Sequence, residues 1–212
     1  MKTVLFVGNS FIYYNDLPAM VQSLSQGKLL CHSVTKGGAF AHQYADPDHE
    51  LGIRLRQTLE AKWDCVVFQD QSFNPVKDPD DCLQAMTVLA SLTDADKYYY
   101  QTWAYQDGSE KLARTGLSYN RLQEGLKQTY ARAAKNGTLV PVGDAFRLAK
   151  ETCPGIELYN ADQYHPSPAG TYLAACVFVG VLCGVHPMTL SDIPEVAEGE
   201  RLRAIAESCI RR

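Results

Sequence analysis

The sequence lacks the features of several broad classes of protein. Its 212 residues contain no stripe of lysine and arginine, and the formal net charge is −4, which disfavours nucleic acid as a partner. The longest apolar run, Leu173 to Val185, is too short and too rich in small residues to cross a bilayer. Repeats, linkers and low-complexity segments are absent as well. We therefore expect one domain, residues 1–212, without a membrane or nucleic-acid partner.

The seven cysteines show no disulfide pattern, because their number is odd and no Cys-x-x-Cys motif occurs. Scattered cysteines in apolar stretches are typical of a reducing compartment. The first apolar run, Val4 to Val7, is soon followed by the polar pair Asn9 and Ser10, so it is too short for the apolar part of a signal peptide. We therefore expect a cytoplasmic protein.

Apolar runs typical of buried strands alternate with segments of helical period. The strands are predicted at 4–7, 29–34, 65–68, 98–102 and 139–142. The helices are predicted at 17–24, 51–59, 82–92, 119–133, 145–151 and 168–183, with a last one around 202–210. Asp78 and Asp144 are the expected N-caps of the third and fifth helices. This alternation predicts an α/β fold with a five-stranded parallel sheet in flavodoxin-like order.

In such sheets ligands bind beyond the carboxyl ends of the strands, so the residues after each strand are candidate site residues. Gly8-Asn9-Ser10 follows the first strand, and Asn15 lies shortly after it. Gly38 follows the second strand, Gln69 and Gln71 follow the third, and Trp103 follows the fourth. Each segment alone is equally consistent with a capping loop, a flexible turn or core packing.

The last loop contains Asp162 and His165, three residues apart, just before a helix that begins near Pro168. This spacing lets a carboxylate bind imidazole Nδ1, which leaves Nε2 free to act as a base. The pattern alone is weak, because Asp46 and His49 repeat it elsewhere in the chain.

Taken together and in this order, these motifs resemble the SGNH/GDSL hydrolase superfamily. The similarity is greatest to a divergent branch with a Val-Val-Phe-Gln-Asp-Gln-Ser third block and a His-Pro-Ser-x-x-Gly fifth block. It extends from Val4 to about Cys183. The resemblance implies a three-layer α/β sandwich and hydrolysis of an acyl ester by a serine nucleophile, without a cofactor.

The resemblance also implies roles for individual residues. Ser10 would be the nucleophile, His165 the base and then the acid, and Asp162 the residue that orients His165. The oxyanion hole would use the N–H groups of Ser10 and Gly38 and a third-block side chain. The usual third-block asparagine is absent, so Gln71 takes its place, with Gln69 as the competitor; both carry an NH₂ donor.

Three further functions stay open. The same site could transfer the acyl group to an acceptor other than water, the fold could serve as a binding module without turnover, or a flavodoxin-like fold could have an unrelated role. His32, His42 and His49 match no metal template, so surface or packing roles are favoured for them.

The expected substrate is a small-molecule ester with a short acyl group, such as an acetyl ester of a sugar. The chain has no spare length for a lid, which predicts an open site. Besides Asn9, Asn15, Gln69 and Trp103, we expect aromatic side chains at the rim of this site: Tyr13, Tyr14, Phe73 and Tyr105. The oligomeric state is not predicted.

Overall fold

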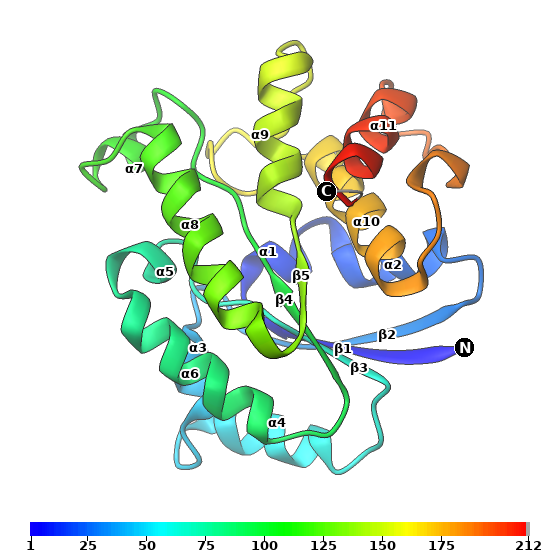
Figure 1. The fold of residues 1–212 in the computed structure, drawn as a ribbon. Coiled ribbons are helices and arrows are strands. Elements are labelled where there is room, and N and C mark those ends of the chain that lie inside the picture. Colours follow the sequence, from blue (N-terminus) through cyan, green and yellow to red (C-terminus); the bar gives the residue numbers. More distant parts are fainter. Residues whose placement is uncertain (211–212) are drawn as a thin grey trace.

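The computed structural model describes residues 1–210, and it contains one sheet of five parallel strands (Figure 1). The strands lie in the order β2-β1-β3-β4-β5, which confirms the predicted flavodoxin-like order. Their bounds are β1 (Lys2–Gly8), β2 (Leu29–Thr35), β3 (Cys65–Phe68), β4 (Asp96–Tyr100) and β5 (Thr138–Val140). Because Gly8 pairs with Thr35 and Val7 with Phe68, the first three strands end at the same edge of the sheet.

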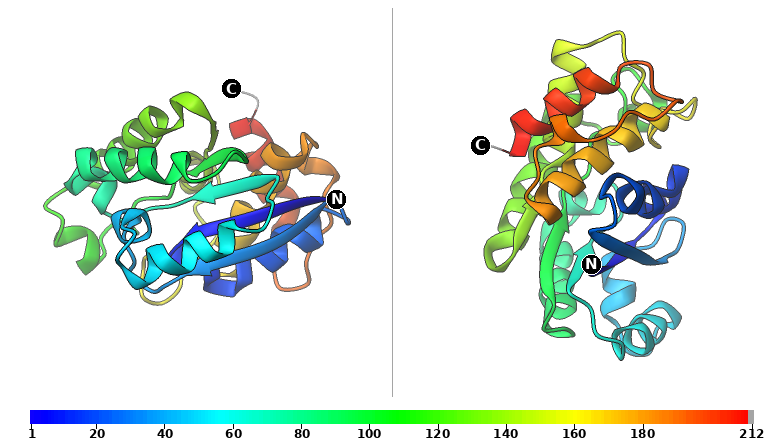
Figure 2. Two further views of the ribbon diagram at one scale, coloured as in Figure 1. Left: turned by 90° about the horizontal axis from the view of Figure 1, so that it is seen from below. Right: turned by 90° about the vertical axis from the view of Figure 1, so that its right-hand side faces the viewer.

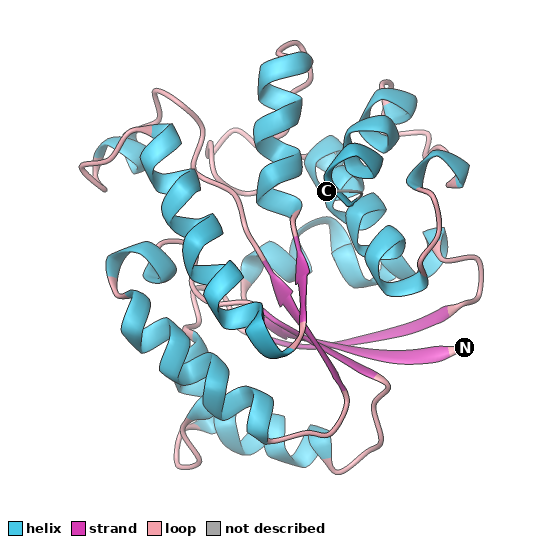
Figure 3. Cartoon of the chain, in the orientation of Figure 1, coloured by secondary structure: helices cyan, strands magenta, loops and turns pink. Residues whose placement is uncertain are grey.

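Helices cover both faces of the sheet and make the predicted three-layer sandwich (Figures 2 and 3). One face carries α1 (Ser10–Tyr13), α2 (Leu17–Leu24), α10 (Pro168–Cys183) and α11 (Gly199–Ile210). The other carries α3 (Ala41–Ala45), α4 (Glu50–Leu59), α5 (Asn74–Lys77), α6 (Pro79–Ser91) and α8 (Tyr119–Ala133). The helix α9 (Val142–Thr152) contacts both α8 and α10, and α7 (Glu110–Ala113) follows β4. Short 3₁₀ turns occupy Tyr14–Asp16, Ala134–Asn136 and Pro187–Thr189.

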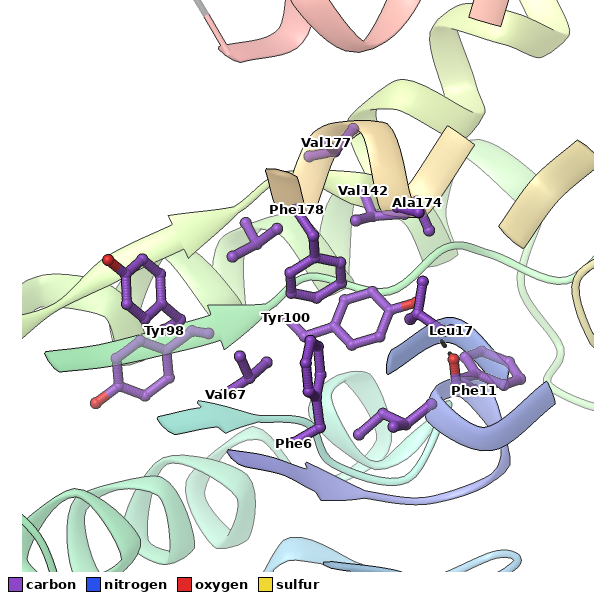
Figure 4. Packing of buried hydrophobic residues seen from close by; sticks show 14 of the residues in the cluster. Phe6, Phe11, Leu17, Val67, Tyr98, Tyr100, Val142, Ala174, Val177 and Phe178 are labelled. Atoms are coloured by element: carbon purple, nitrogen blue, oxygen red, sulfur yellow. Dashed lines mark hydrogen bonds between the residues drawn. The ribbon is translucent and has the colours of Figure 1, made fainter. Parts of the chain in front are cut away.

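The core between the sheet and α10 is built around an aromatic cluster (Figure 4). The ring of Phe178 from α10 meets Phe6 of β1 and Tyr100 of β4 edge-on, at centroid distances of 5.2 and 4.8 Å. All three side chains are fully buried. The longest apolar run of the sequence is thus a helix buried against the sheet. Within residues 1–210, no helix is both long and apolar enough to cross a membrane.

Two local predictions near β4 and β5 need correction. Both strands end two residues earlier than predicted, at Tyr100 and Val140. The following helix α9 begins at Val142, so Asp144 lies within its first turn and is not its N-cap. The carboxylate of Asp144 instead accepts hydrogen bonds from Gln101 Nε2 and Lys127 Nζ. The predicted cap at Asp78 is confirmed, because its side chain accepts a hydrogen bond from Asp81 N.

Candidate active site

The loop after β1 places the Ser10 hydroxyl at the edge of the sheet. Asn9 is the N-cap of α1, and its Oδ1 accepts a hydrogen bond from Phe11 N. Its Nδ2 donates to the carbonyl oxygens of Ala39 and Asp70 at 3.1 and 3.4 Å, which joins the loops after β1, β2 and β3. Because Asn9 performs the capping, the Ser10 side chain at the first helical position is left for another partner.

That partner is His165. Its Nε2 lies 2.8 Å from Ser10 Oγ, and its Nδ1 lies 2.6 Å from Asp162 Oδ2. The chain thus brings together three residues that sequence reasoning had selected, over a separation of 155 positions between Ser10 and His165. The His165 side chain is only 8% exposed, whereas the Asp162 side chain is 35% exposed.

The second Asp-x-x-His pair has a different geometry. His49 is the N-cap of α4, and its Nδ1 accepts a hydrogen bond from Leu51 N. Asp46 Oδ1 accepts a hydrogen bond from Asp48 N. His49 therefore caps a helix, and Asp46 makes only a local hydrogen bond with the backbone.

The loop that carries Asp162 and His165 is closed by its own hydrogen bonds. Asp162 Oδ1 accepts from the backbone N–H groups of Tyr164 and His165, while Asn160 N donates to the carbonyl oxygen of His165. Gln163 adopts a left-handed conformation with φ of 65°, which turns the chain back. The carboxylate is thus fixed by backbone contacts as well as by the imidazole.

Aromatic rings surround the His165 imidazole. Tyr14 lies parallel to it, with ring centroids 3.8 Å apart and an interplanar angle of 6°. Tyr164 approaches with a centroid distance of 4.0 Å, and Phe11 meets the ring edge-on at 5.7 Å. The sequence predicts Tyr14 at the rim of the site, but only the fold shows that its ring stacks on His165.

Burial and charge act in opposite directions on the titration of this pair. Burial is the main cause that lowers the pKa of His165 below 6.5; Asp162 acts to raise it, and the cation of Lys111 adds to the lowering. Partial burial acts to raise the pKa of Asp162, but the hydrogen bonds from His165 and Tyr164 outweigh it and hold that pKa below 3.8. The imidazole is therefore neutral near pH 7.

The turn after β2 is closed by a hydrogen bond of 3.1 Å from Ala39 N to the Lys36 carbonyl oxygen. Gly38 occupies its third position with φ of 71°, a conformation that favours glycine. The Asn9 side chain binds the Ala39 carbonyl oxygen of the same turn. These contacts place the predicted Gly38 close to the Ser10 loop.

The two glutamines after β3 differ in their partners. Gln69 is buried; its Oε1 accepts from Asn9 N at 2.9 Å, and its Nε2 donates to the Asp70 carbonyl oxygen. Gln71 is half-buried; its Oε1 accepts from Phe73 N and Asn74 N, and its Nε2 contacts Ser72 Oγ at 3.3 Å. The latter contact uses one of the two hydrogens of the NH₂ group.

Asp70, which sequence analysis did not assign a role, joins the loops after β2 and β3. Its side chain is fully buried, and Oδ1 accepts from the backbone N–H groups of Ala41 and Gln71, both at 2.7 Å. Oδ2 accepts from Asn74 Nδ2. Burial raises the pKa of this carboxyl. Its position after a strand could have suggested a structural role, but its partners depend on tertiary contacts.

Asn15 and Trp103, which were predicted to contact the substrate, make contacts within the protein. Asn15 Nδ2 donates to the Pro166 carbonyl oxygen and to Thr171 Oγ1, both at 2.9 Å, and so ties the Ser10 loop to the His165 loop. Trp103 is fully buried between Phe11 and Phe146. The expectation that Trp103 contacts a ligand is therefore corrected: the apolar interior excludes its ring from the surface.

His32 and His42, the other two histidines considered as metal ligands, lie outside this arrangement. His32 packs edge-on against Trp63, and His42 Nδ1 lies 2.9 Å from Asp81 Oδ2. Among residues 1–210, no three His, Cys, Asp or Glu side chains are grouped as metal ligands would be.

Comparison with known proteins gives matches among solved structures. No family model and no curated protein matches the chain. A provisionally assigned SGNH hydrolase from Slackia heliotrinireducens is 29% identical, with a TM-score of 0.78 over 85% of this chain and 98% of that one. A DUF4886 family protein from Bacteroides uniformis is 18% identical, with a TM-score of 0.82 over 99% and 95% of the two chains. An acetyl xylan esterase is 13% identical, with a TM-score of 0.65 over 85% and 99%.

The last two similarities concern the fold, and the first adds sequence identity over most of both chains. The sheet order and the similarity to solved SGNH and GDSL-type proteins agree with the motif resemblance. The fold, together with the 29% sequence identity to a solved SGNH hydrolase over 85% of this chain, supports assignment to the SGNH/GDSL hydrolase superfamily.

Proposed function

We propose that this chain is a serine esterase that removes a short acyl group from a small polar ester through an acyl-enzyme. The observation that carries the proposal is the continuous series of contacts from Ser10 Oγ through the His165 imidazole to the Asp162 carboxylate. A serine hydroxyl becomes a useful nucleophile when an adjacent base takes its proton, and the base must be oriented by a third group.

In the first half of the reaction, Ser10 Oγ attacks the acyl carbonyl carbon while His165 Nε2 takes the hydroxyl proton. Asp162 holds the Nδ1 proton and stabilises the imidazolium that forms. The tetrahedral intermediate then collapses, the ester C–O bond breaks, and Nε2 gives its proton to the leaving alcohol.

In the second half, a water molecule replaces the alcohol. His165 takes a proton from this water as its oxygen attacks the acyl carbon, and a second tetrahedral intermediate forms. Its collapse breaks the bond to Ser10 Oγ, returns the proton to that oxygen, and releases the carboxylic acid.

We assign the oxyanion hole to the N–H groups of Ser10 and Gly38 and to Gln71 Nε2. The first N–H groups of a helix have no acceptor within the helix, which favours Ser10 N. Gln71 is favoured over Gln69 because Gln69 is buried and its Nε2 donates to the Asp70 carbonyl oxygen, whereas Gln71 is half-buried and lines the pocket beside Asp162. In Gln71, the two backbone N–H groups on Oε1 fix the orientation of the NH₂ group.

The proposal is tested with p-nitrophenyl acetate and a fluorophosphonate probe on the wild-type chain and three variants. We expect the wild type to hydrolyse the ester and to be labelled by the probe. Ser10→Ala abolishes both, and His165→Ala lowers the rate by several orders of magnitude. His49→Ala, which changes the other Asp-x-x-His pair, keeps the wild-type rate. A wild-type chain that binds esters but is neither labelled nor active is a binding module, and the proposal then fails.

A further inference from the structure

A pocket of about 580 Å³ adjoins the Asp162 side of the candidate active site. Its walls come from three loops that follow β2, β3 and β4 and from the loop that carries Asp162 and His165. Gln71, Asp162 and Tyr164 belong both to the candidate active site and to the pocket lining. A molecule with one group in the pocket can therefore place another group near Ser10.

The pocket combines aromatic walls with cationic side chains. The aromatic residues are Phe40, Phe73, Tyr105 and Tyr164. The cationic residues are Lys77 from α5, and Lys111 and Arg114 from the α7 segment, and these two helices lie at the left of Figure 1. Aromatic walls hold the carbon skeleton of a small ligand, and a few charged groups select its polar end.

The acidic residues of the pocket already have partners. Glu110 pairs with Arg114, and Asp162 is bound by His165 and by two backbone N–H groups. Among residues 1–210, Lys77 and Lys111 make no ion pair with a carboxylate. The pocket lining holds three cationic and two acidic side chains, so it keeps a net charge of +1.

Lys111 is the better placed of these two cations. Its Nζ lies 3.1 Å from the centroid of the Tyr164 ring and 5.1 Å from that of Tyr105, while Lys77 is exposed. The Lys111 side chain is half-buried, and burial lowers the pKa of its ammonium group, although the nearby Asp162 carboxylate acts to raise it. An ammonium group that has lost part of its hydration and faces two rings gains more from an added anion than a solvated one does.

We propose that Lys111 makes this pocket a subsite for an anionic group of the ester substrate, a carboxylate or a phosphate. The inference rests on the proposed esterase function and narrows its substrate to an acidic ester. The aromatic walls then contact the carbon skeleton that joins the anion to the ester.

The test uses matched ester pairs that differ only in charge. On the alcohol side, 4-acetoxyphenylacetate is compared with its primary amide, because the methylene group keeps the leaving-group chemistry similar. On the acyl side, mono-p-nitrophenyl glutarate is compared with the p-nitrophenyl ester of its monoamide. The preference is the ratio of kcat/KM for the charged ester to that for the neutral one. The pair that shows the preference locates the anion on the alcohol or on the acyl part.

We expect the wild type to prefer the charged ester in one pair by roughly 10- to 100-fold, as for a hydrogen bond to a charged group. Lys111→Met keeps the length of the side chain, removes the charge, and brings the ratio close to one. Lys111→Arg keeps most of the preference. Lys135→Met serves as the matched control and leaves the ratio unchanged. Lys135 lies in the 3₁₀ turn before β5, at the amino end of that strand, whereas the candidate site lies beyond the carboxyl ends of the strands.

The inference is wrong if neither pair shows a preference, or if Lys111→Met keeps it while remaining folded by circular dichroism. Failure of the esterase proposal looks different, because the wild type then hydrolyses none of the four esters and Ser10 is not labelled.

Discussion

The phenol ring of Tyr14 lies flat against the imidazole of His165, with centroids 3.8 Å apart and planes 6° from parallel. Tyr14 follows α1, the helix that begins with Ser10. The same short segment therefore supplies the hydroxyl to one edge of the imidazole and a ring to its face.

This stacking predicts a kinetic role for Tyr14 as a positioning residue. In Tyr14→Leu, we expect kcat to fall by roughly 2- to 10-fold, since an aromatic pair contributes about 0.5–1.5 kcal/mol. Tyr14→Phe retains the ring and should keep the wild-type kcat. Steady-state kinetics on p-nitrophenyl acetate measure both. If kcat falls as much in Tyr14→Phe as in Tyr14→Leu, the hydroxyl group of Tyr14 matters rather than its ring.

The pH dependence follows from the protonation of His165. The imidazole must be neutral to accept the Ser10 proton, so activity is lost as the pH falls through its pKa. Because burial lowers this pKa below 6.5, we expect the acid limb of kcat/KM to lie below pH 6.5. In Lys111→Met the limb moves to higher pH, because the nearby cation that lowers the pKa of His165 is gone. A limb above pH 6.5 in the wild type would contradict this assignment.

Asp162→Asn changes the orientation of the base rather than the nucleophile. An asparagine cannot hold the Nδ1 proton as a carboxylate does, so Nε2 is no longer the free base. We expect kcat to fall by roughly 10⁴-fold while the fold is kept. The measurement is kcat together with the thermal unfolding midpoint. A variant that retains a tenth of the wild-type rate would exclude the proposed role of Asp162.

Substitutions at the two glutamines after β3 are expected to affect different properties, namely catalysis at Gln71 and stability at Gln69. Gln71→Glu keeps an acceptor for Phe73 N and Asn74 N but removes the NH₂ donor, so kcat should fall by at least roughly 10²–10³-fold with little change in stability. Gln69→Leu leaves the buried Asn9 N–H without its partner, at a cost of about 1–3 kcal/mol in the free energy of unfolding. Urea unfolding and kinetics on both variants separate the roles, and the opposite result would reverse the assignment of the oxyanion donor.

The contact between Gln69 and the β1 loop also depends on Gly8. A Cβ atom at this position would lie 2.4 Å from Gln69 Oε1 and 2.8 Å from Ile12 Cδ1. We therefore expect Gly8→Ala to lower the free energy of unfolding by about 1–3 kcal/mol. Gly155→Ala is the matched control, since nothing lies within 4 Å of its added Cβ. Equal unfolding midpoints for the two variants would contradict the close approach.

The sequence predicts the fold well because the central strands β1 and β3 are buried and contain unbroken apolar runs. The strand ends are harder to predict, because the β-branched residues Thr102 and Val142 follow the observed ends at Tyr100 and Val140. Asp144 illustrates the same limit: its position suits a cap, but Lys127 and Gln101 supply its partners through tertiary contacts.

Within the site, the spacing of Asp162 and His165 predicts their contact, because both lie in one short loop. The spacing alone does not distinguish them from Asp46 and His49, whereas the His-Pro-Ser motif that begins at His165 and the long-range contact with Ser10 do so. For a related reason, the sequence does not predict the burial of Trp103. An aromatic residue after a strand can face the cleft or the core, and here Phe146 from α9 covers it.

The 155-residue separation between Ser10 and His165 has a consequence for the chain during its synthesis. At a translation rate of roughly 5–20 residues per second, the serine is made about 8–30 s before its base exists. Until then its hydroxyl is an ordinary alcohol, and a nascent or truncated chain has no activated nucleophile. Esterase activity in a coupled translation assay should thus begin only after the chain has passed His165, so its onset would follow synthesis of the base rather than of the serine.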